Sequence, residues 1–239
     1  LPCILLLSLL LPGCGNKQPV VQEAFLLDTF VSVTLYDGDE EQAQGALDLC
    51  RSYEDIFSRT DPDSELYRSH PNWCIHINGR KRSQWRHQLC LDLSRTEVQD
   101  YLIDSLSRVL SGANIAYVKW DCNRRISEPG SDGLPPESQD ELLHRYVLGL
   151  YRVLETLTSR FPEVLFENCA SGGARMDAGM MYYFPQTWVS DNSDAVCRLR
   201  IQYGTSLCYP PVMTTAHISA SPNHQVLRQT PLDFRAAVA

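Results

Sequence analysis

After its N-terminal part, the chain alternates short apolar segments with longer segments that are apolar on one side only. Residues 89–93 and 115–120 predict strands, and residues 96–111 between them place apolar side chains three or four positions apart, as in an amphipathic helix. Residues 138–160 repeat the helical spacing and lead into a further strand at 164–168. Because strands joined by helices run parallel with right-handed crossovers, this alternation predicts an α/β fold built on a parallel sheet.

The composition excludes several classes of protein. The chain has 239 residues, of which 44% are hydrophobic and 21% charged, as in an ordinary globular protein. A net charge of −8 and a pI near 5.2 argue against nucleic acid as the main partner, because phosphate binding requires a dense basic face. The nine cysteines include no CxxC pair and no Cys/His cluster with metal-ligand spacing, so we expect neither a zinc site nor a disulfide scaffold.

The first residues form an almost purely apolar segment. It is too short to span a bilayer, which takes about 20 apolar residues, and it is typical of a secretory signal. The segment runs into Leu11-Pro-Gly-Cys14-Gly-Asn16, which resembles the lipobox of bacterial lipoproteins, whose cysteine is acylated after cleavage. We therefore expect residues 1–14 to be a signal segment and Cys14 to carry a lipid that anchors the chain to a membrane surface. A buried apolar strand or helix is the alternative.

Residues 15–66 follow a second pattern. Residues 31–36 alternate with period two and predict a strand, and residues 40–59 predict a helix with one apolar side. Residues 11–66 as a whole resemble the start of the membrane-anchored FAD:protein FMN transferases, which are periplasmic lipoproteins. The flavin-binding and magnesium-binding segments of that family have no counterpart here, so we expect no flavin chemistry from this part of the chain.

Chemically active side chains gather where the predicted strands end. Lys119, Asp121 and Asn123 follow one apolar strand, a small-residue loop at 169–177 follows the next, and Asp191 lies further along. Functional side chains of parallel α/β folds collect at such strand ends. Two carboxylates there can flank a glycosidic bond, about 5–5.5 Å apart in a retaining glycosidase and about 6.5–9.5 Å apart in an inverting one.

These two carboxylates would take opposite protonation states. Lys119 lies two residues before Asp121 on the same side of the strand, so its charge is expected to keep Asp121 ionised as a nucleophile. Asp191 would need a drier setting in order to hold a proton. Either Asp taken alone is better explained as a helix cap or loop carboxylate, so the inference depends on the pair.

Two further features allow more than one interpretation. Trp188 is equally well explained as a core residue or as a wall on which a sugar stacks. The segment Ser171-Gly172-Gly173 lacks the GxxxxGK[ST] and GxGxxG patterns of phosphate-binding loops. Gly172 is better explained by the close approach of a sugar to bare backbone.

Several motifs together resemble the glycoside hydrolase family 36 α-galactosidases over about residues 63–239. The motifs are HPNW (70–73), LDLSRTEV (91–98), YVKWDCNR (117–124), RYVLGLY (145–151), YYFPQ (182–186), WVSD (188–191) and RIQYGTSLCYPP (200–211). The resemblance implies a partial (β/α)8 TIM-barrel catalytic domain over residues 67–239, with no metal and no organic cofactor.

The same resemblance assigns roles to individual residues. It implies that Asp121 is the nucleophile and Asp191 the general acid/base of a retaining double displacement on terminal α-D-galactosyl residues of oligosaccharides. The positions that line the galactose subsite in the family are occupied here by Arg86, Lys119, Trp120, Cys122, Asn123 and Cys169. Gly172 and Trp188 complete the set of expected substrate contacts.

The sequence also departs from that family. The loop at 169–174 contains alanines where the family has Cys-Ser followed by four glycines, and Asn192 stands where a second Asp is common. The early barrel strands and the flanking domains have no counterpart, which predicts little or no turnover by the chain itself. Because residues 61–68 suit both families, we interpret the chain as a chimera fused across that stretch. A natural two-domain protein is the alternative.

The expected function is that of an α-galactosidase. The alternatives are a fragment of a membrane-anchored flavin transferase and a galactoside-binding module without turnover. The leader predicts export to a membrane, whereas the hydrolase resemblance predicts a cytoplasmic bacterial enzyme, so the sequence leaves the compartment open. The intact parent of the hydrolase part is expected to be able to form oligomers.

Overall fold

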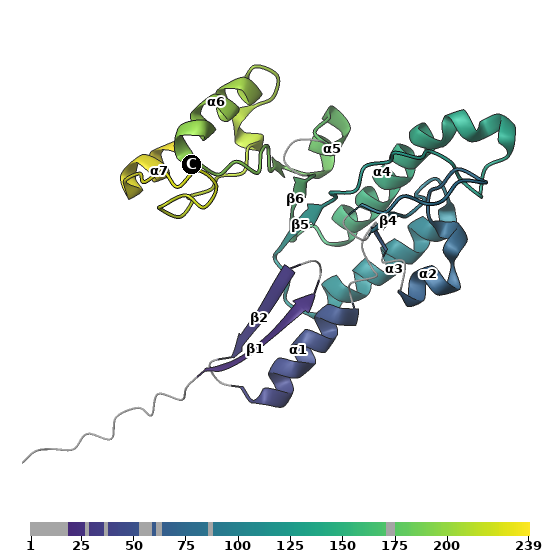
Figure 1. Ribbon diagram of the computed structural model, residues 1–239, viewed down its shortest axis with the longest axis horizontal. Helices are drawn as coiled ribbons and strands as arrows, with labels where there is room; N and C mark the ends of the chain where they lie inside the picture. The colour runs from purple at the N-terminus through teal and green to yellow at the C-terminus, as the bar shows by residue number, and fades with distance from the viewer. Residues whose placement is uncertain are drawn as a thin grey trace, which may run out of the picture. The chain divides into compact units, whose positions relative to one another are not determined.

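The computed structural model describes residues 19–26, 29–35, 38–52, 59–60, 64–85, 88–170 and 175–239. The chain divides into two compact units, Leu1–Glu54 and Asp55–Ala239 (Figure 1). The predicted signal segment with Cys14 lies outside the described residues. None of the helices in the described part of the chain combines the length and the apolar character that crossing a membrane requires.

The first unit contains a β-hairpin and a helix. Strands β1 (Val20–Leu26) and β2 (Thr29–Leu35) pair antiparallel, and α1 (Glu40–Ser52) follows. At the start of the helix, the side chains of Asp39 and Gln42 each accept a hydrogen bond from the backbone N–H of the other residue. This reciprocal cap satisfies two donors that have no partner within the helix. The predicted strand and the start of the predicted helix are confirmed, whereas β1 was not predicted. The predicted end of the helix at residue 59 lies beyond the described part of α1.

The second unit is built on a parallel sheet. Strands β5 (Tyr117–Asp121), β6 (Leu165–Cys169) and β7 (Gln186–Thr187) lie in the order β5-β6-β7, and both pairings are parallel. A parallel bridge from Thr187 to Thr214 extends the sheet by one further segment. The α/β fold with a parallel sheet, which the strand–helix alternation predicts, is confirmed for this unit.

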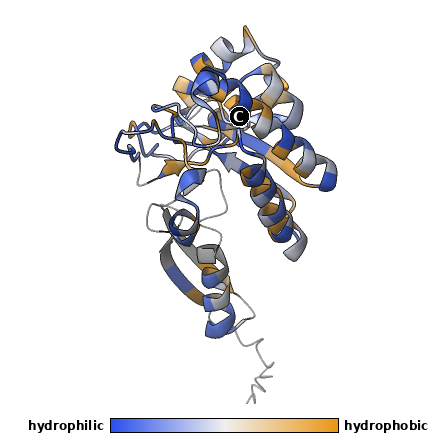
Figure 2. Cartoon of the chain, turned by 90° about the vertical axis from the view of Figure 1, so that its right-hand side faces the viewer, coloured by the Kyte–Doolittle hydropathy of each residue, from blue (hydrophilic) through white to orange (hydrophobic). Residues whose placement is uncertain are grey.

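Two long helices of this unit pack against each other and bury apolar side chains between them. Helices α3 (Thr96–Gly112) and α4 (Leu142–Arg160) pack side by side (Figure 1), and α4 is preceded by the 3-10 helix η2 (Pro136–Glu141). Hydrophobic and hydrophilic residues alternate along the helices of the chain (Figure 2), as one-sided spacing predicts. The fully buried side chains on their facing sides are Val98, Leu102, Leu142, Val153, Leu154 and Leu157.

Shorter elements complete the unit. They are β3 (Arg59–Thr60), α2 (Glu65–Ser69), η1 (Pro71–Trp73), β4 (Leu89–Cys90), α5 (Ala178–Tyr183), α6 (Ala195–Ser206), η3 (Pro211–Met213) and α7 (Leu232–Val238). Asp177 and Asp194 begin α5 and α6, because each side chain accepts a hydrogen bond from a backbone N–H of the first helical turn.

The predicted strand at 89–93 is present but shorter than predicted, and it does not belong to the parallel sheet. Strand β4 covers only Leu89–Cys90 and pairs antiparallel with β3, so it is outside the parallel sheet. The chain turns directly afterwards, where the Asp92 carboxylate accepts hydrogen bonds from the backbone and hydroxyl of Ser94. An apolar run reports that a segment is buried, and it does not identify the strand beside which the segment lies.

The two faces of the parallel sheet differ in chemistry. Trp120 and Phe166 lie on one face, and both rings pack edge-to-face against Phe184, with centroids 6.4 and 6.3 Å from it. Lys119 and Glu167, which alternate with these residues along their strands, lie on the opposite face. The aromatic face belongs to the core, and the polar face carries the candidate site.

Helix α4 approaches the preceding segments so closely that one position requires glycine. A Cβ atom at Gly149 would lie 1.8 Å from the Leu93 carbonyl oxygen and 2.6 Å from Gln99 Nε2. Gln99 donates to that same carbonyl at 2.8 Å, so the added methyl would also break this buried hydrogen bond. Gly149 therefore fixes the distance at which α4 packs.

We expect Gly149→Ala to destabilise the protein by about 3 kcal/mol, because overpacking and an unsatisfied amide outweigh the better helix propensity of alanine. The urea midpoint of the purified chain measures this effect. Gly204→Ala is the matched control, since Gly204 also lies inside a helix but has nothing within 4 Å of the new Cβ. Equal stability of the two variants would contradict the close packing of α4.

Candidate active site at the carboxyl ends of the parallel strands

The two carboxylates singled out from the sequence follow strands of one sheet. Asp121 is the last residue of β5, and Asp191 lies four residues after the end of β7. Both strands run parallel to β6, which lies between them, so the two residues follow the same edge of the sheet. Adjacent strands are about 4.8 Å apart, which puts the β5 and β7 backbones about 10 Å apart. Side chains from two such strands can reach toward one substrate.

One carboxylate oxygen of Asp121 accepts a hydrogen bond, and the other has no partner among the residues that the structure describes. Asn123 Nδ2 donates to Asp121 Oδ2 at 2.7 Å, and the Cys122 N–H continues the ladder to the Cys169 carbonyl at 3.0 Å. Oδ1 is buried and has no hydrogen-bond partner within the described ranges. A buried acceptor without a partner costs about 1–3 kcal/mol, so it is rare away from functional sites. The turn after β5 therefore orients the Asp121 carboxylate through Oδ2 and leaves Oδ1 without a hydrogen bond from any described residue.

Asp191 is held by one residue that precedes it and by one that follows it much later in the chain. Trp188 Nε1 donates to Asp191 Oδ1 at 2.9 Å, and Gln225 Nε2 donates to the Asp191 carbonyl at 2.8 Å. The backbone N–H of Trp188 is itself bonded to the carbonyl of Asn168 on β6 at 2.8 Å. The segment that carries Asp191 is thus tied to the middle strand of the sheet.

Two cationic side chains contact the Trp188 ring. The residue is 9% exposed, with Lys119 Nζ 4.5 Å and the Arg198 guanidinium carbon 4.8 Å from the centroid of its ring. Arg198 is 2% exposed and also donates to the Ser190 carbonyl at 3.2 Å. Of the two interpretations of Trp188 that the sequence left open, these contacts favour a buried structural ring. Cation–π contacts in a desolvated setting stabilise such a ring by about 2 kcal/mol.

The partner of Lys119 differs from the expected one. Lys119 Nζ forms an ion pair with Glu167 Oε1 at 3.1 Å, whereas the hydrogen-bond donor to Asp121 is Asn123. The expectation that Lys119 acts directly on Asp121 rested on their spacing along one strand. Glu167 is level with Lys119 on the adjacent strand and offers its carboxylate at closer range. Burial raises the pKa of the Glu167 carboxyl.

The other predicted substrate contacts lie in different settings. Cys122 and Cys169 lie beside each other at the ends of β5 and β6, next to Asp121. The Trp120 side chain is 2% exposed and belongs to the aromatic face of the sheet. Arg86 and Gly172 lie outside the described residues.

Two residues that organise this edge were not predicted from the sequence. Arg175 donates to the carbonyls of Trp120 and Cys169, at 3.1 and 3.2 Å, and ties the ends of β5 and β6 together. Glu167 faces the candidate site from the middle strand. Its alternation with Cys169 along the predicted strand was a signal that could have identified it.

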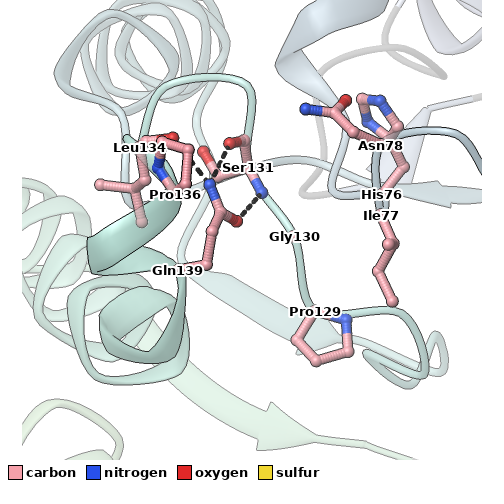
Figure 3. Close-up of a pocket in the computed structure, with 9 residues that line it drawn as sticks. All are labelled: His76, Ile77, Asn78, Pro129, Gly130, Ser131, Leu134, Pro136 and Gln139. Carbon is pink, nitrogen blue, oxygen red and sulfur yellow. Dashed lines mark hydrogen bonds between the residues drawn. The ribbon is translucent and has the colours of Figure 1, made fainter.

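A separate pocket lies between the segments 76–78 and 129–139 (Figure 3), with a cavity volume of ≈ 410 Å³. On one side of it, the Gln139 side chain bridges the backbone of Ser131 and the Leu134 carbonyl. Neither candidate carboxylate lines it. In the part of the chain that the structure describes, no group of three or more His, Cys, Asp or Glu side chains could hold a metal ion.

Known proteins match the second unit. The family model described as Melibiase matches residues 57–239. The alpha-galactosidase AgaA of Geobacillus stearothermophilus is 60% identical over 178 residues, which are 74% of this chain and 24% of that protein. Alpha-galactosidase C of Emericella nidulans is 54% identical over 179 residues, which are 75% of this chain and 23% of that protein.

Solved structures agree with these matches. A crystal structure of an AgaA variant in complex with raffinose superposes with a TM-score of 0.74 at 58% identity, covering 76% of this chain and 25% of that one. The alpha-galactosidase from Lactobacillus brevis superposes with a TM-score of 0.73 at 50% identity, covering 76% of this chain and 24% of that one. The chain therefore spans about a quarter of the length of the relatives it matches.

Proposed function

The chain belongs to the Melibiase family, and from this premise we propose that it carries both catalytic carboxylates of a retaining α-galactosidase. The observation that supports the proposal most directly is the position of Asp121 and Asp191 after parallel strands at one edge of the sheet. In barrel enzymes, the catalytic residues come from the ends of several different strands at one face.

Asp121 is the nucleophile in this proposal. Asn123 holds Oδ2, so the orientation of the carboxylate is set before substrate arrives. Oδ1 is the oxygen without a hydrogen-bond partner in the described residues, and it attacks the anomeric carbon. The C–O bond to the leaving group breaks as the bond to Oδ1 forms, which gives a β-linked galactosyl-enzyme with inversion at that carbon.

Asp191 is the general acid and then the general base. The indole N–H of Trp188 donates to Oδ1, so Oδ2 is the oxygen that can carry the proton. This proton passes to the leaving-group oxygen in the first step. In the second step the carboxylate takes a proton from water as that water attacks the galactosyl-enzyme from the opposite side. Two inversions give net retention of the α configuration.

The finer assignments are part of the same proposal. The parallel sheet with α3 and α4 would form part of a (β/α)8 barrel, and Lys119, Cys122, Asn123 and Cys169 would line the galactose subsite. Oligosaccharides with a terminal α-galactosyl residue are the proposed substrates, since a relative binds raffinose. Arg86, Gly172, Trp120 and Trp188 stay predicted contacts. The lipid on Cys14, the domain bounds 1–14, 15–66 and 67–239, and the flavin-transferase origin of the second segment also stay predictions.

A segment exchange tests the proposal in a complete enzyme. The matching segment of AgaA is replaced by the 178 aligned residues of this chain, which are 60% identical to it. We expect this exchange enzyme to hydrolyse an aryl α-galactoside, because the segment supplies both carboxylates in a compatible sheet. The unmodified AgaA is the control for expression and activity. A folded but inactive exchange enzyme would contradict the proposed function.

Retention gives a second test. We expect proton NMR during hydrolysis by the exchange enzyme to show α-galactose first, with the β anomer appearing only by mutarotation. The reason is that each of the two displacements inverts the anomeric carbon. Release of β-galactose as the first product would exclude the roles given to Asp121 and Asp191.

A further inference from the structure

Glu167 is a buried carboxylate at the centre of the site's polar face. It lies on β6, level with Lys119 on β5 and Gln186 on β7. The side chain is 2% exposed, and its Oε1 is 3.1 Å from Nζ of Lys119, whose own side chain is 42% exposed. An unpaired buried charge is strongly unfavourable, so the ammonium is held against the carboxylate although it could otherwise extend into water.

The ammonium of Lys119 also contacts the residue that holds Asp191. Its Nζ lies 4.5 Å from the centroid of the Trp188 ring, and the N–H of that ring donates to Asp191 Oδ1 at 2.9 Å. A cation near an indole ring is attracted to the ring and makes the N–H a stronger donor. Three consecutive contacts therefore connect Glu167 with Asp191.

From these contacts we propose that Glu167 is a positioning residue, which sets the orientation of Asp191 through Lys119 and the indole of Trp188. The proposal deepens the proposed function, because the role given to Asp191 rests on it. The contacts themselves do not depend on that role. Glu167 itself need not touch the substrate.

The charged groups around this chain of contacts come from several elements. Lys119 faces Glu167 from β5, and Arg198 contacts the Trp188 ring from α6. The His217 ring lies 5.1 Å from the ring centroid of Trp188, after η3. Burial, Arg198 and Lys119 lower the pKa of His217, which keeps this ring neutral near pH 7. Glu167 is the buried acid in this group, and burial raises its pKa.

NMR of the full chain tests the proposal without reference to catalysis. The chain has three lysines, Lys17, Lys81 and Lys119, and four tryptophans, so 13Cε-lysine and 15N-indole labels give few signals. We expect the Lys119 and Trp188 signals to shift together as the pH falls, with one midpoint above the usual Glu value of about 4.3. Protonation of Glu167 releases the ammonium, which changes its contact with the indole.

Glu167→Gln keeps the shape of the side chain and removes its charge, so we expect this shared transition to disappear. Glu163→Gln is the matched control, because Glu163 is an exposed carboxylate just before β6, and the transition should persist in that variant. A transition that persists in Glu167→Gln, or signals that do not respond to pH while the chain stays folded, would overturn the proposal.

A double-mutant cycle separates positioning from a general structural effect. We expect Glu167→Gln to shift the Trp188 indole signal in the parent and to leave it unchanged in a Lys119→Met background, because the effect passes through the ammonium. An equal shift in both backgrounds would mean that Glu167 acts by another route, which overturns the proposal. The Lys119→Met chain alone also shows whether loss of the cation is sufficient to move the indole.

Kinetics of the exchange enzyme supply the link with function. We expect Glu167→Gln to lower kcat by about tenfold to a hundredfold on galactosides with poor leaving groups, since small misplacements of a catalytic group have effects of this size. The fall in kcat should be smaller on galactosides with acidic phenol leaving groups, because such a leaving group needs little protonation as it departs. An equal loss for both leaving groups would overturn the link to Asp191. An inactive exchange enzyme with an intact NMR transition would count against the proposed function alone.

Discussion

Asp121→Ala is expected to abolish hydrolysis of α-galactosides by the exchange enzyme, with kcat falling about 10⁴-fold or more. Without the carboxylate no galactosyl-enzyme can form, and water alone is a weak nucleophile toward the anomeric carbon. The fold should tolerate the change, because it removes the single hydrogen bond from Asn123 to Oδ2, whereas Oδ1 has no partner to lose in the described part of the chain. Initial rates on an aryl α-galactoside measure the effect. Asp104→Ala, which removes an exposed carboxylate from α3, is the control.

Chemical rescue makes the test specific for a nucleophile. Azide should enter the space that the Asp121 carboxylate vacates and attack from the same side, so the rescued product is expected to be β-galactosyl azide. If azide does not rescue Asp121→Ala while Asp104→Ala is fully active, the fall in kcat comes from altered folding or binding, and Asp121 is not the nucleophile. Formation of α-galactosyl azide would contradict the assignment directly.

Asp191→Ala should give the second largest loss, and its size should depend on the leaving group. We expect kcat on raffinose-type substrates to fall about 10²–10⁴-fold, because the sugar alkoxide must be protonated as it leaves. Substrates with acidic phenols should form the galactosyl-enzyme at nearly the parent rate. The intermediate then accumulates, since the base that activates water is also missing. Mass spectrometry of the quenched enzyme should show the added galactosyl group.

Azide again reports the side of attack. In Asp191→Ala it should intercept the β-linked galactosyl-enzyme from the opposite side and give α-galactosyl azide. The two alanine variants are therefore expected to give opposite anomers of one product, which no loss of stability can mimic. Losses that are equal for good and poor leaving groups would exclude Asp191 as the general acid.

Local periodicity predicted four elements of the second unit, β5, β6, α3 and α4. The helical spacing of residues 96–111 and 138–160 corresponds to α3 and α4, and the apolar segments before Asp121 and Cys169 correspond to β5 and β6. These patterns are reliable because each depends on residues only a few positions apart. The start of α4 differs by a turn of 3-10 helix, as helix ends commonly do.

The errors concern contacts between segments that are distant in the sequence. The apolar run at 89–93 was assigned to the parallel sheet, but β4 pairs with β3, because burial alone does not select a partner strand. Lys119 was assigned to Asp121, two residues away, but its ion pair is with Glu167, 48 positions along the chain. The parallel register places those two residues side by side.

The amino-acid sequence by itself determined the order of strands and helices and the acidic residues that follow particular strands, because these depend on spacing along the chain. Only the tertiary structure decided which strands are neighbours and that Asp121 and Asp191 follow one edge of a single sheet. It also decided that the Trp188 indole donates to Asp191 and contacts Lys119, which pairs with Glu167. The physical reason is that strand pairing and ion pairing join residues through space. Their free energies depend on the burial and register of both partners, which no local pattern contains.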